Sequence, residues 1–434
     1  METTSSAWLL QTELTGELHR LLAFWSTRMP DKVHGGFYGA ADFRGVPDPM
    51  EDKGIILNAR ILWSFSAAFN HTGNNQYKDM AQRAWEYLTA HFEDKSCGGY
   101  YWKTDYSGRA TETRKQTYAQ AFVIYAFAEY YKAAKQKEVL DRALSLFGLL
   151  EQHARDKHQG GYWEALSREW KEIPDVRLSD KDLNEKKSLN THLHVLEAYT
   201  ALYQVAPSRH LGQSLRDLIE LFPKYLINPN GHLNLFFDGQ WQLKSHTISY
   251  GHDIEASWLL MEAAEALDDP SLKQGIGTLS LHMAQTFLNE AMAPEGGVLN
   301  ETNTITGHTD TDRHWWVQIE AMVGLVRAYQ QSGSEPYLET AVAIWTYIKT
   351  CFLDHQNGEW HWLIGANGVA DTSQVKAGFW KCPYHNTRGC MEITTCLQDI
   401  LQTKPISIPN TNVHESNSRT FELLETTNKL IISE

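Results

Sequence analysis

Cysteine is scarce in this chain, and the cysteines that are present form no recognisable pattern. The five residues, Cys97, Cys351, Cys382, Cys390 and Cys396, are odd in number, and no CxxC pair occurs. A chain of 434 residues is also long enough to bury a core without disulfide bonds. We therefore expect a protein of a reducing compartment, the cytoplasm.

Long apolar runs, a basic N-terminus and an excess of positive charge are also missing. Thr3 to Ser6 lead directly into an amphipathic helical pattern, so no signal peptide is expected. Apolar runs such as 121–128 are much too short to span a bilayer. The 39 Lys and Arg are outnumbered by 53 Asp and Glu, which gives a net charge of -14. This balance argues against nucleic acid or membrane as a partner and leaves neutral or cationic ligands open.

Aromatic residues are plentiful by contrast, with 15 Trp, 19 Tyr and 16 Phe. Flat rings stack on the apolar faces of sugars, but large helical cores use aromatic residues too, so both interpretations stay open. Hydrophobic residues make up 42% of the chain and charged residues 21%, as in a globular protein with a large core. We expect a monomer or a weak homo-oligomer.

A glycine followed by aromatic or apolar residues recurs six times along the chain. The motifs begin at Gly35, Gly98, Gly160, Gly231, Gly296 and Gly358. The steps between them, read from these positions, are 63, 62, 71, 65 and 62 residues. A near-constant period of this length indicates a repeat architecture.

Each interval holds two helical patterns, the first small-residue-rich and apolar on several sides, the second charged on one face. With an N-terminal and a C-terminal helix the number expected is twelve, over 6–26, 54–70, 77–93, 116–134, 138–155, 187–206, 208–226, 252–267, 272–290, 314–332, 335–353 and 383–402. Six inner and six outer helices predict an all-α (α/α)6 barrel. An open solenoid could use the same repeat, but it gives no reason for polar residues on inner helices. We expect one catalytic domain over 1–404 and a polar tail over 405–434.

Polar and aromatic residues fall at one phase of this repeat, near the start of each inner helix. They are Arg60, Tyr118, Asn190, His252, Trp316 and His385. Residues at one phase meet at one end of a ring, so these side chains are expected to face a common cavity.

The stretch from Ser249 to Leu260 is the most informative of these helix starts. Gly251 is expected to break the preceding segment, and a helix follows in which His252 and Glu255 point to one side, within reach of each other. Such a pair is one way to build an acid/base site. Taken alone, it is more often a histidine satisfied by a neighbouring acid at a helix start.

Two further pairs share a helix face by their spacing. Asn190 and His194 are four residues apart, as are Trp316 and Glu320. Each pair alone is more often structural than catalytic, whereas together, in one phase, they favour a site. His192 points away from His194 and is expected to be a packing residue.

Three chemistries compete for this set of residues. A zinc or iron site is possible, but neither HExxH nor a close CxxC cluster is present, so we expect no metal. Glycoside hydrolysis needs two carboxylates, which Glu255 and Glu320 could supply, but it leaves the histidines unexplained. Proton transfer at a carbon next to a carbonyl uses His252 and His385 as bases and an arginine for the oxyanion, and it fits the residues best.

Four segments in order resemble the cellobiose 2-epimerases of the N-acylglucosamine 2-epimerase superfamily. They are 190–198 (NTHLHVLEA), 250–258 (YGHDIEASW), 313–320 (RHWWVQIE) and 380–385 (WKCPYH). The resemblance covers roughly residues 7–402 and agrees with the (α/α)6 barrel expected from the repeat.

The resemblance implies cofactor-independent, reversible epimerisation at C2 of the reducing-end glucose of β-1,4-linked disaccharides, from cellobiose to glucosyl-mannose and from lactose to epilactose. Some relatives also form the ketose slowly. The implied catalytic residues are His252, His385, His194 and Glu255, with Glu255 orienting His252. The implied sugar-binding residues are Arg60, Tyr118, Asp182, Asn190, Trp316, Glu320 and Trp380. The alternatives are an N-acylglucosamine 2-epimerase, a mannose-type aldose–ketose isomerase and, more distantly, an (α/α)6 glycoside hydrolase or a non-catalytic sugar-binding barrel.

Overall fold

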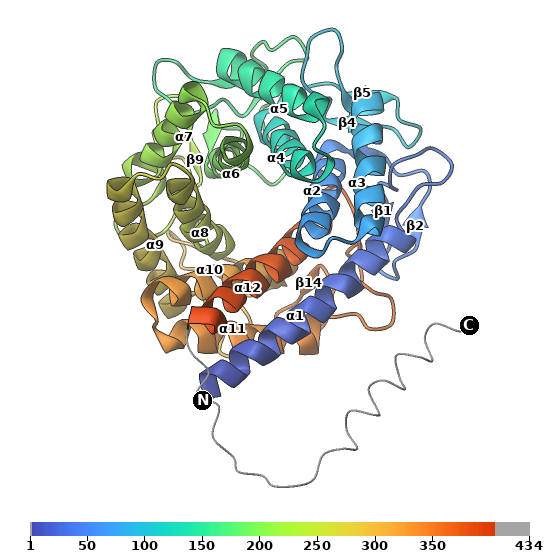
Figure 1. Ribbon diagram of the computed structural model, residues 1–434. Helices are drawn as coiled ribbons and strands as arrows, with labels where there is room; N and C mark the ends of the chain where they lie inside the picture. Colours follow the sequence, from blue (N-terminus) through green and yellow to red (C-terminus); the bar gives the residue numbers. More distant parts are fainter. Residues whose placement is uncertain (1, 404–434) are drawn as a thin grey trace, which may run out of the picture.

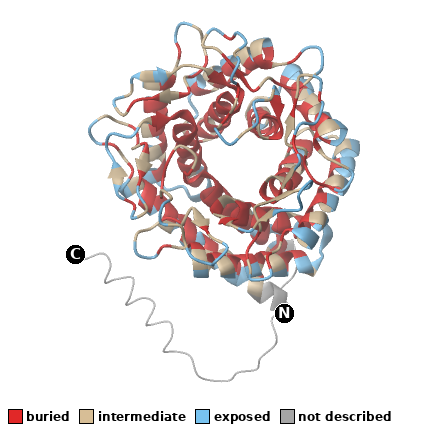
Figure 2. Ribbon diagram, turned by 180° about the vertical axis from the view of Figure 1, so that it is seen from behind, coloured by how far each residue is buried: buried red, intermediate tan, exposed pale blue. Residues whose placement is uncertain are grey.

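Six helices rich in small and apolar residues form the inner wall of a ring in the computed structural model, which describes residues 2–403 (Figure 1). These inner helices are α2 (Ile55–Thr72), α4 (Thr117–Ala134), α6 (Leu189–Val205), α8 (Tyr250–Ala266), α10 (Trp315–Ser332) and α12 (Tyr384–Thr403). Fourteen of the 18 residues of α2 are buried, as expected of a helix covered on all sides. Figure 2 shows the same burial around the whole inner wall.

Six outer helices surround this wall and present one face to water. They are α1 (Glu2–Thr27), α3 (Asn75–Tyr87), α5 (Lys137–Leu149), α7 (Arg209–Leu221), α9 (Pro270–Glu290) and α11 (Glu335–Tyr347). Only five of the 13 residues of α3 are buried. Four outer helices end in a wider π turn, at Leu88–Phe92, Leu150–Ala154, Phe222–Leu226 and Ile348–Phe352. The twelve helices expected from the sequence are thus present within residues 2–403.

The last inner helix closes the ring, because α12 packs against both α2 and α10. This contact confirms the (α/α)6 barrel and excludes the open solenoid. The expected domain boundary at residue 404 and the polar tail 405–434 lie outside the described residues.

Short strands that the sequence analysis missed tie neighbouring repeats together. They are β1 (Ala40–Ala41), β2 (Pro47–Asp48), β3 (Lys53–Gly54), β4 (Lys103–Thr104), β5 (Ala110–Glu112), β6 (Lys115–Gln116), β7 (Ala165–Leu166), β8 (Lys187–Ser188), β9 (Phe236–Phe237), β10 (Thr247–Ser249), β11 (Glu301–Asn303), β12 (Thr309–Asp310), β13 (Arg313–His314) and β14 (Leu363–Ile364). The strand before an inner helix pairs antiparallel with a strand of the next repeat: β3 with β4, β6 with β7, β8 with β9, β10 with β11, and β13 with β14. A single bridge between Ala41 and Ala377 joins the last repeat to the first. Two-residue strands carry no readable period, so the sequence did not reveal them.

The glycine motifs are held against the starts of the inner helices by a repeated polar contact. In four repeats, a side chain in the first turn of the inner helix accepts a hydrogen bond from a backbone N–H just after the glycines. The donor and acceptor residues are Tyr100 and Gln120 (2.8 Å), Tyr162 and His192 (2.9 Å), Leu233 and Asp253 (2.8 Å), and Val298 and Gln318 (2.8 Å). His192 is therefore a packing residue, as expected. In these four copies the motif therefore anchors one inner helix at the same end of the ring.

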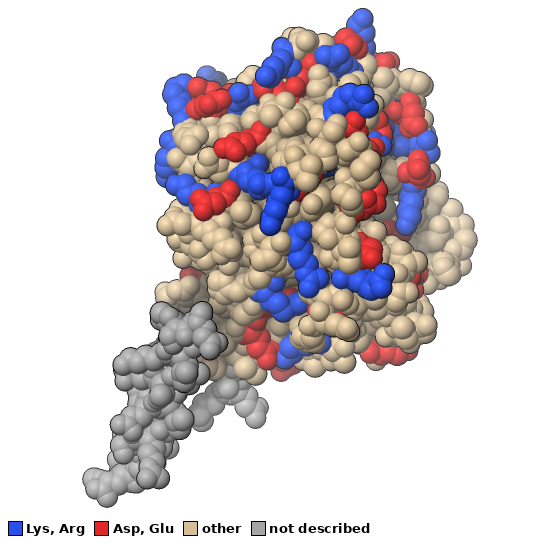
Figure 3. Space-filling model, turned by 90° about the vertical axis from the view of Figure 1, so that its right-hand side faces the viewer, with Lys and Arg blue, Asp and Glu red and all other residues tan. Residues whose placement is uncertain are grey.

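The surface carries charges of both signs. On the face drawn in Figure 3, lysine and arginine are interspersed with aspartate and glutamate. Within residues 2–403, no helix is sufficiently long and apolar to cross a bilayer.

Candidate active site

A cavity of about 450 Å³ opens at the end of the ring where the inner helices begin. Ten of the eleven residues that the sequence predicted for the site line it: Arg60, Tyr118, Asp182, Asn190, His194, His252, Glu255, Trp316, Trp380 and His385. The remaining one, Glu320, is fully buried behind this wall. The phase of the repeat thus brings residues from all six inner helices to one cavity.

His385 is held by Glu320, which corrects the expectation that Glu320 lines the sugar pocket. The Nδ1 atom of His385 lies 2.7 Å from Oε1 of Glu320, one helix away on α10. A carboxylate at Nδ1 favours the tautomer that leaves Nε2 as the base and stabilises the imidazolium once a proton is taken up. Burial and the nearby Arg60 charge lower the pKa of His385 well below its ordinary value.

His252 is held by the residue that caps its own helix. Its Nδ1 atom lies 2.8 Å from Oγ of Ser249, and its ring packs on Trp316 with centroids 4.9 Å apart. The His385 ring lies against the same indole, at 5.6 Å. Burial lowers the pKa of His252 to about 4, against the opposing charge of Glu255. Both imidazoles are therefore mainly in the neutral form at pH 7.

Glu255 was expected to orient His252, but the two side chains form no direct hydrogen bond. Glu255 accepts a hydrogen bond from Arg388 on α12 instead, so it acts on His252 through its charge. The helix also starts earlier than expected, at Tyr250, and Gly251 lies inside its first turn. A Cβ at Gly251 would lie 2.5 Å from the Trp316 ring, so the glycine serves the close approach of that indole.

Arg388 joins three buried carboxylates that the three histidines depend on. Its guanidinium donates to Glu197, to Glu255 and, at 2.6 Å, to Glu320. We call these four residues the Arg388 cluster. Burial alone would lower the pKa of Arg388, but the carboxylates outweigh it and raise the pKa well above its ordinary value. One permanent charge thus compensates carboxylates that would otherwise repel one another.

His194 belongs to the same arrangement through Glu197, one turn further along α6. Its Nδ1 atom lies 2.9 Å from Oε2 of Glu197. Burial would raise the pKa of Glu197, but the Arg388 charge and the hydrogen bonds from His194 and Tyr384 lower it to about 2. Glu197 is therefore ionised and keeps an N–H on the side of His194 that faces away from the cavity.

Arg60 and Tyr118 form the positive side of the cavity. Nη2 of Arg60 donates to the Tyr118 hydroxyl at 2.7 Å, and its Cζ lies 4.2 Å from the centre of the Phe122 ring. Burial raises the pKa of Tyr118, against the opposing Arg60 charge, so the hydroxyl stays protonated. A guanidinium and a phenol next to each other can stabilise an oxyanion.

A metal ion does not fit the carboxylates of this site. Glu255, Glu320 and His385 bring three ligand atoms within 4.8 Å of one another. The Oε1 atoms of both glutamates, however, already accept hydrogen bonds from Arg388. The Arg388 guanidinium thus supplies the positive charge that a metal ion would otherwise bring to these carboxylates.

The aromatic walls and one long loop complete the cavity. Trp380 is half-buried beside Tyr118, with ring centroids 6.2 Å apart, and its carbonyl accepts from Arg60 at 3.4 Å. Asp182 lies in the loop between β7 and β8, where its carboxylate accepts from the N–H (2.8 Å) and hydroxyl (3.0 Å) of Ser179. Burial raises the pKa of Asp182.

Several residues of the site were missed in the sequence analysis. They are Glu197, Ser249, Tyr384 and Arg388 among the supporting residues, and Leu178, Ser179, Asp180, Lys181, His314, Trp315 and Trp362 in the wall. Glu197 and Arg388 could have been found, because each lies three residues after a predicted site histidine and so shares its helix face. The loop residues carried no such signal.

Comparison with known proteins decides the family. The model of the family described as N-acylglucosamine 2-epimerase (GlcNAc 2-epimerase) matches residues 36–388. The chain belongs to this family. It is 46% identical over 387 residues to the cellobiose 2-epimerase of Bacteroides fragilis, covering 89% of this chain and 98% of that protein. The cellobiose 2-epimerase of Dictyoglomus turgidum is 36% identical, covering 89% and 98%.

Solved structures of the family agree with the fold. The structure of the cellobiose 2-epimerase from Spirochaeta thermophila matches with a TM-score of 0.86 and 34% identity, over 92% of this chain and 98% of that one. A D-mannose isomerase structure matches with a TM-score of 0.78 at 21% identity, which shows the fold alone. The resemblance stated from the sequence motifs is thereby confirmed.

Proposed function

We propose that this chain is a cellobiose 2-epimerase that inverts C2 of the reducing-end glucose of β-1,4-linked disaccharides by proton transfer, without a cofactor. The observation that carries the proposal is the pair His252 and His385. They come from different inner helices, face one cavity and flank one indole, and each has its Nδ1 atom satisfied. The two cellobiose 2-epimerases that are 46% and 36% identical to this chain support a β-1,4-linked disaccharide as the substrate.

The reaction begins with opening of the reducing-end sugar ring in the cavity. His194 and Arg60 line the wall where they can serve the ring oxygen and O1, the first as a proton carrier and the second as a fixed charge. Ring opening moves the O1 proton to the ring oxygen and leaves a C1 carbonyl, which acidifies the hydrogen on C2.

One histidine then takes the C2 proton, and the electron pair of the C–H bond forms the C1–C2 double bond of an enediolate. The negative charge on O1 is stabilised by Arg60 and the Tyr118 hydroxyl. The other histidine takes up a proton from water and delivers it to the opposite face of C2, which restores the C1 carbonyl with inverted configuration. The first histidine then releases its proton to water, so both imidazoles return to the neutral form. The steps balance without an oxidant, a reductant or a metal. Glu320 stabilises the imidazolium of His385 while it holds the proton.

The remaining walls suit a second sugar ring. A cavity of about 450 Å³ lies within the range of small-molecule sites, and Trp316, Trp362 and Trp380 offer ring faces for stacking. Asp182 and Asn190 supply polar groups for hydroxyls. These features favour a disaccharide over a single acylated sugar.

A panel of four sugars distinguishes this function from that of an N-acylglucosamine 2-epimerase or a mannose-type aldose–ketose isomerase. We expect conversion of cellobiose and lactose to products with mannose at the reducing end, with kcat/KM at least tenfold above that for mannose or N-acetylmannosamine. Product analysis by chromatography and NMR is the measurement. Preference for N-acetylmannosamine or mannose would move the assignment to those enzymes, and release of free glucose would indicate a hydrolase.

The pH dependence of the reaction follows from the buried histidines. A base works in its neutral form, and burial lowers the pKa of His252 to about 4 and that of His385 well below 6.5. The neutral forms therefore persist as pH falls below 6.5, and kcat/KM is expected to decline only as pH approaches about 4. Circular dichroism at each pH provides the control for unfolding. Half-loss of kcat/KM near pH 6.5 in folded protein would contradict this account.

A further inference from the structure

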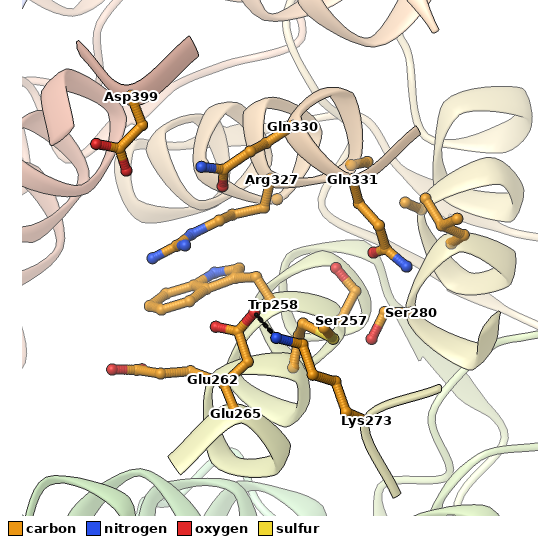
Figure 4. Close-up of a pocket in the computed structure, with 15 residues that line it drawn as sticks. Ser257, Trp258, Glu262, Glu265, Lys273, Ser280, Arg327, Gln330, Gln331 and Asp399 are labelled. Carbon is orange, nitrogen blue, oxygen red and sulfur yellow. Dashed lines mark ion pairs between the residues drawn. The ribbon is translucent and has the colours of Figure 1, made fainter. Parts of the chain in front are cut away.

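A second cavity of about 430 Å³ lies between α8, α9 and α10, and Trp258 forms part of its wall (Figure 4). Its lining comes from the second halves of α8 and α10, whereas the catalytic residues sit at their starts. The two cavities share no lining residue. The second one is therefore separate from the site described above.

Trp258 stands between the two cavities. The indole is 3% exposed and lines the second cavity, while Cζ of Arg388 lies 4.8 Å from its ring centre on the catalytic side. Only a small part of the indole therefore reaches the second cavity, where it supplies an apolar edge of the wall.

A buried hydroxyl in this cavity lacks a hydrogen-bond partner within the described residues. The Oγ atom of Ser280 is without one, although the residue is only 6% exposed. A serine on a helix can satisfy its hydroxyl on the carbonyl four residues earlier, so an unmatched one facing a cavity needs an explanation. In Figure 4 the Ser280 oxygen points into the space between Ser257 and Lys273.

The charges around the cavity favour a neutral ligand. Three carboxylates, Glu262, Glu265 and Asp399, would repel an anion. A cation would meet Lys273, which pairs with Glu265 at 3.5 Å, and Arg327. Ligand hydroxyls both donate and accept, so they match Ser280, the lining amides of Gln330 and Gln331, and a carboxyl group.

Glu262 supports this preference for hydroxyl groups. Burial and the charge of Glu392 raise its pKa to about 7, against the opposing charge of Arg327. A carboxyl group that is partly protonated at neutral pH can donate to one hydroxyl and accept from the next.

From these features we infer that the second cavity is a binding site for a pyranose sugar, separate from the catalytic cavity. The sugar lies against the edge of Trp258 and hydrogen-bonds to Ser280 and Glu262. Binding there does not require ring opening, so a glycoside that cannot be epimerised is a suitable ligand.

Equilibrium dialysis of the full chain with radiolabelled methyl β-D-glucopyranoside tests this site. Ser280→Leu places a larger apolar side chain in the cavity, and Ser280→Ala is the matched control that removes the hydroxyl without filling the space. We expect two binding sites per chain in the wild type, one in Ser280→Leu, and two in Ser280→Ala with the second at least threefold weaker.

Epimerase activity and melting temperature serve as checks that the variants fold, because Ser280 does not line the catalytic cavity. If Ser280→Leu does not fold, Glu262→Leu takes its place with the same expected loss of one site. Equal sugar capacity in wild type and the folded blocking variant would overturn the inference, as would the absence of measurable binding to the wild type. Neither result bears on the proposed epimerase activity, which is measured separately.

Discussion

Replacing His385 by asparagine is expected to lower kcat by about 10²–10⁴-fold, the contribution typical of a positioned general acid/base. Asparagine keeps a donor for Glu320 but has no titratable nitrogen. His252→Asn should cause a loss of the same order, because both imidazoles line the cavity and flank Trp316. Initial rates of cellobiose conversion, with helix content followed by circular dichroism, are the measurement.

The double variant sharpens this expectation. Residues that act as a unit lose little more together than apart, so His252→Asn with His385→Asn should be no more than about tenfold slower than either single variant. His308→Asn, at an exposed position, is the control and should keep full activity. A folded His385→Asn enzyme within tenfold of the wild type would exclude His385 as the base.

Replacing Arg388 by methionine is expected to have the largest effect on stability. The variant leaves Glu197, Glu255 and Glu320 buried near one another without their shared positive charge. Breaking a buried ion pair by removing one partner costs about 3–5 kcal/mol. The free energy of unfolding from urea titration should fall by this amount, and kcat should fall as well, because Glu197 and Glu320 orient His194 and His385.

Two further variants test the cause of that loss. Adding Glu255→Gln to Arg388→Met removes one uncompensated charge and should restore part of the lost stability. Arg216→Met removes a half-exposed arginine that pairs with Asp269 at 2.9 Å, and it should cost no more than about 1 kcal/mol. Arg388→Met with a stability loss as small as that of Arg216→Met would show that the Arg388 cluster does not depend on its cation.

The barrel architecture could be predicted because the sequence repeats with a nearly constant period. Six glycine motifs and the alternation of apolar and one-faced helices gave the barrel, and the common phase of Arg60, His252 and His385 gave the cavity. Residues on one helix face are close in space by geometry alone, so spacing also pointed to His194 and Trp316.

What the sequence concealed depends on contacts between helices far apart in the chain. Glu255 lies beside His252 in the sequence, but its hydrogen bond goes to Arg388, 133 residues away. The resemblance implied that Glu320 binds the sugar, whereas it lies behind His385. Such pairings depend on how α8, α10 and α12 meet, which no local pattern specifies.

The most direct test of the proton-transfer account is conversion of cellobiose in deuterium oxide, with a chelator present and no nucleotide or metal added. We expect glucosyl-mannose that carries deuterium at C2, and deuterium at C2 of the recovered cellobiose, both read by NMR and mass spectrometry. In His385→Asn, both signals should fall together. Product formed without deuterium at C2 would contradict proton transfer through the two histidines, and release of glucose would contradict epimerisation.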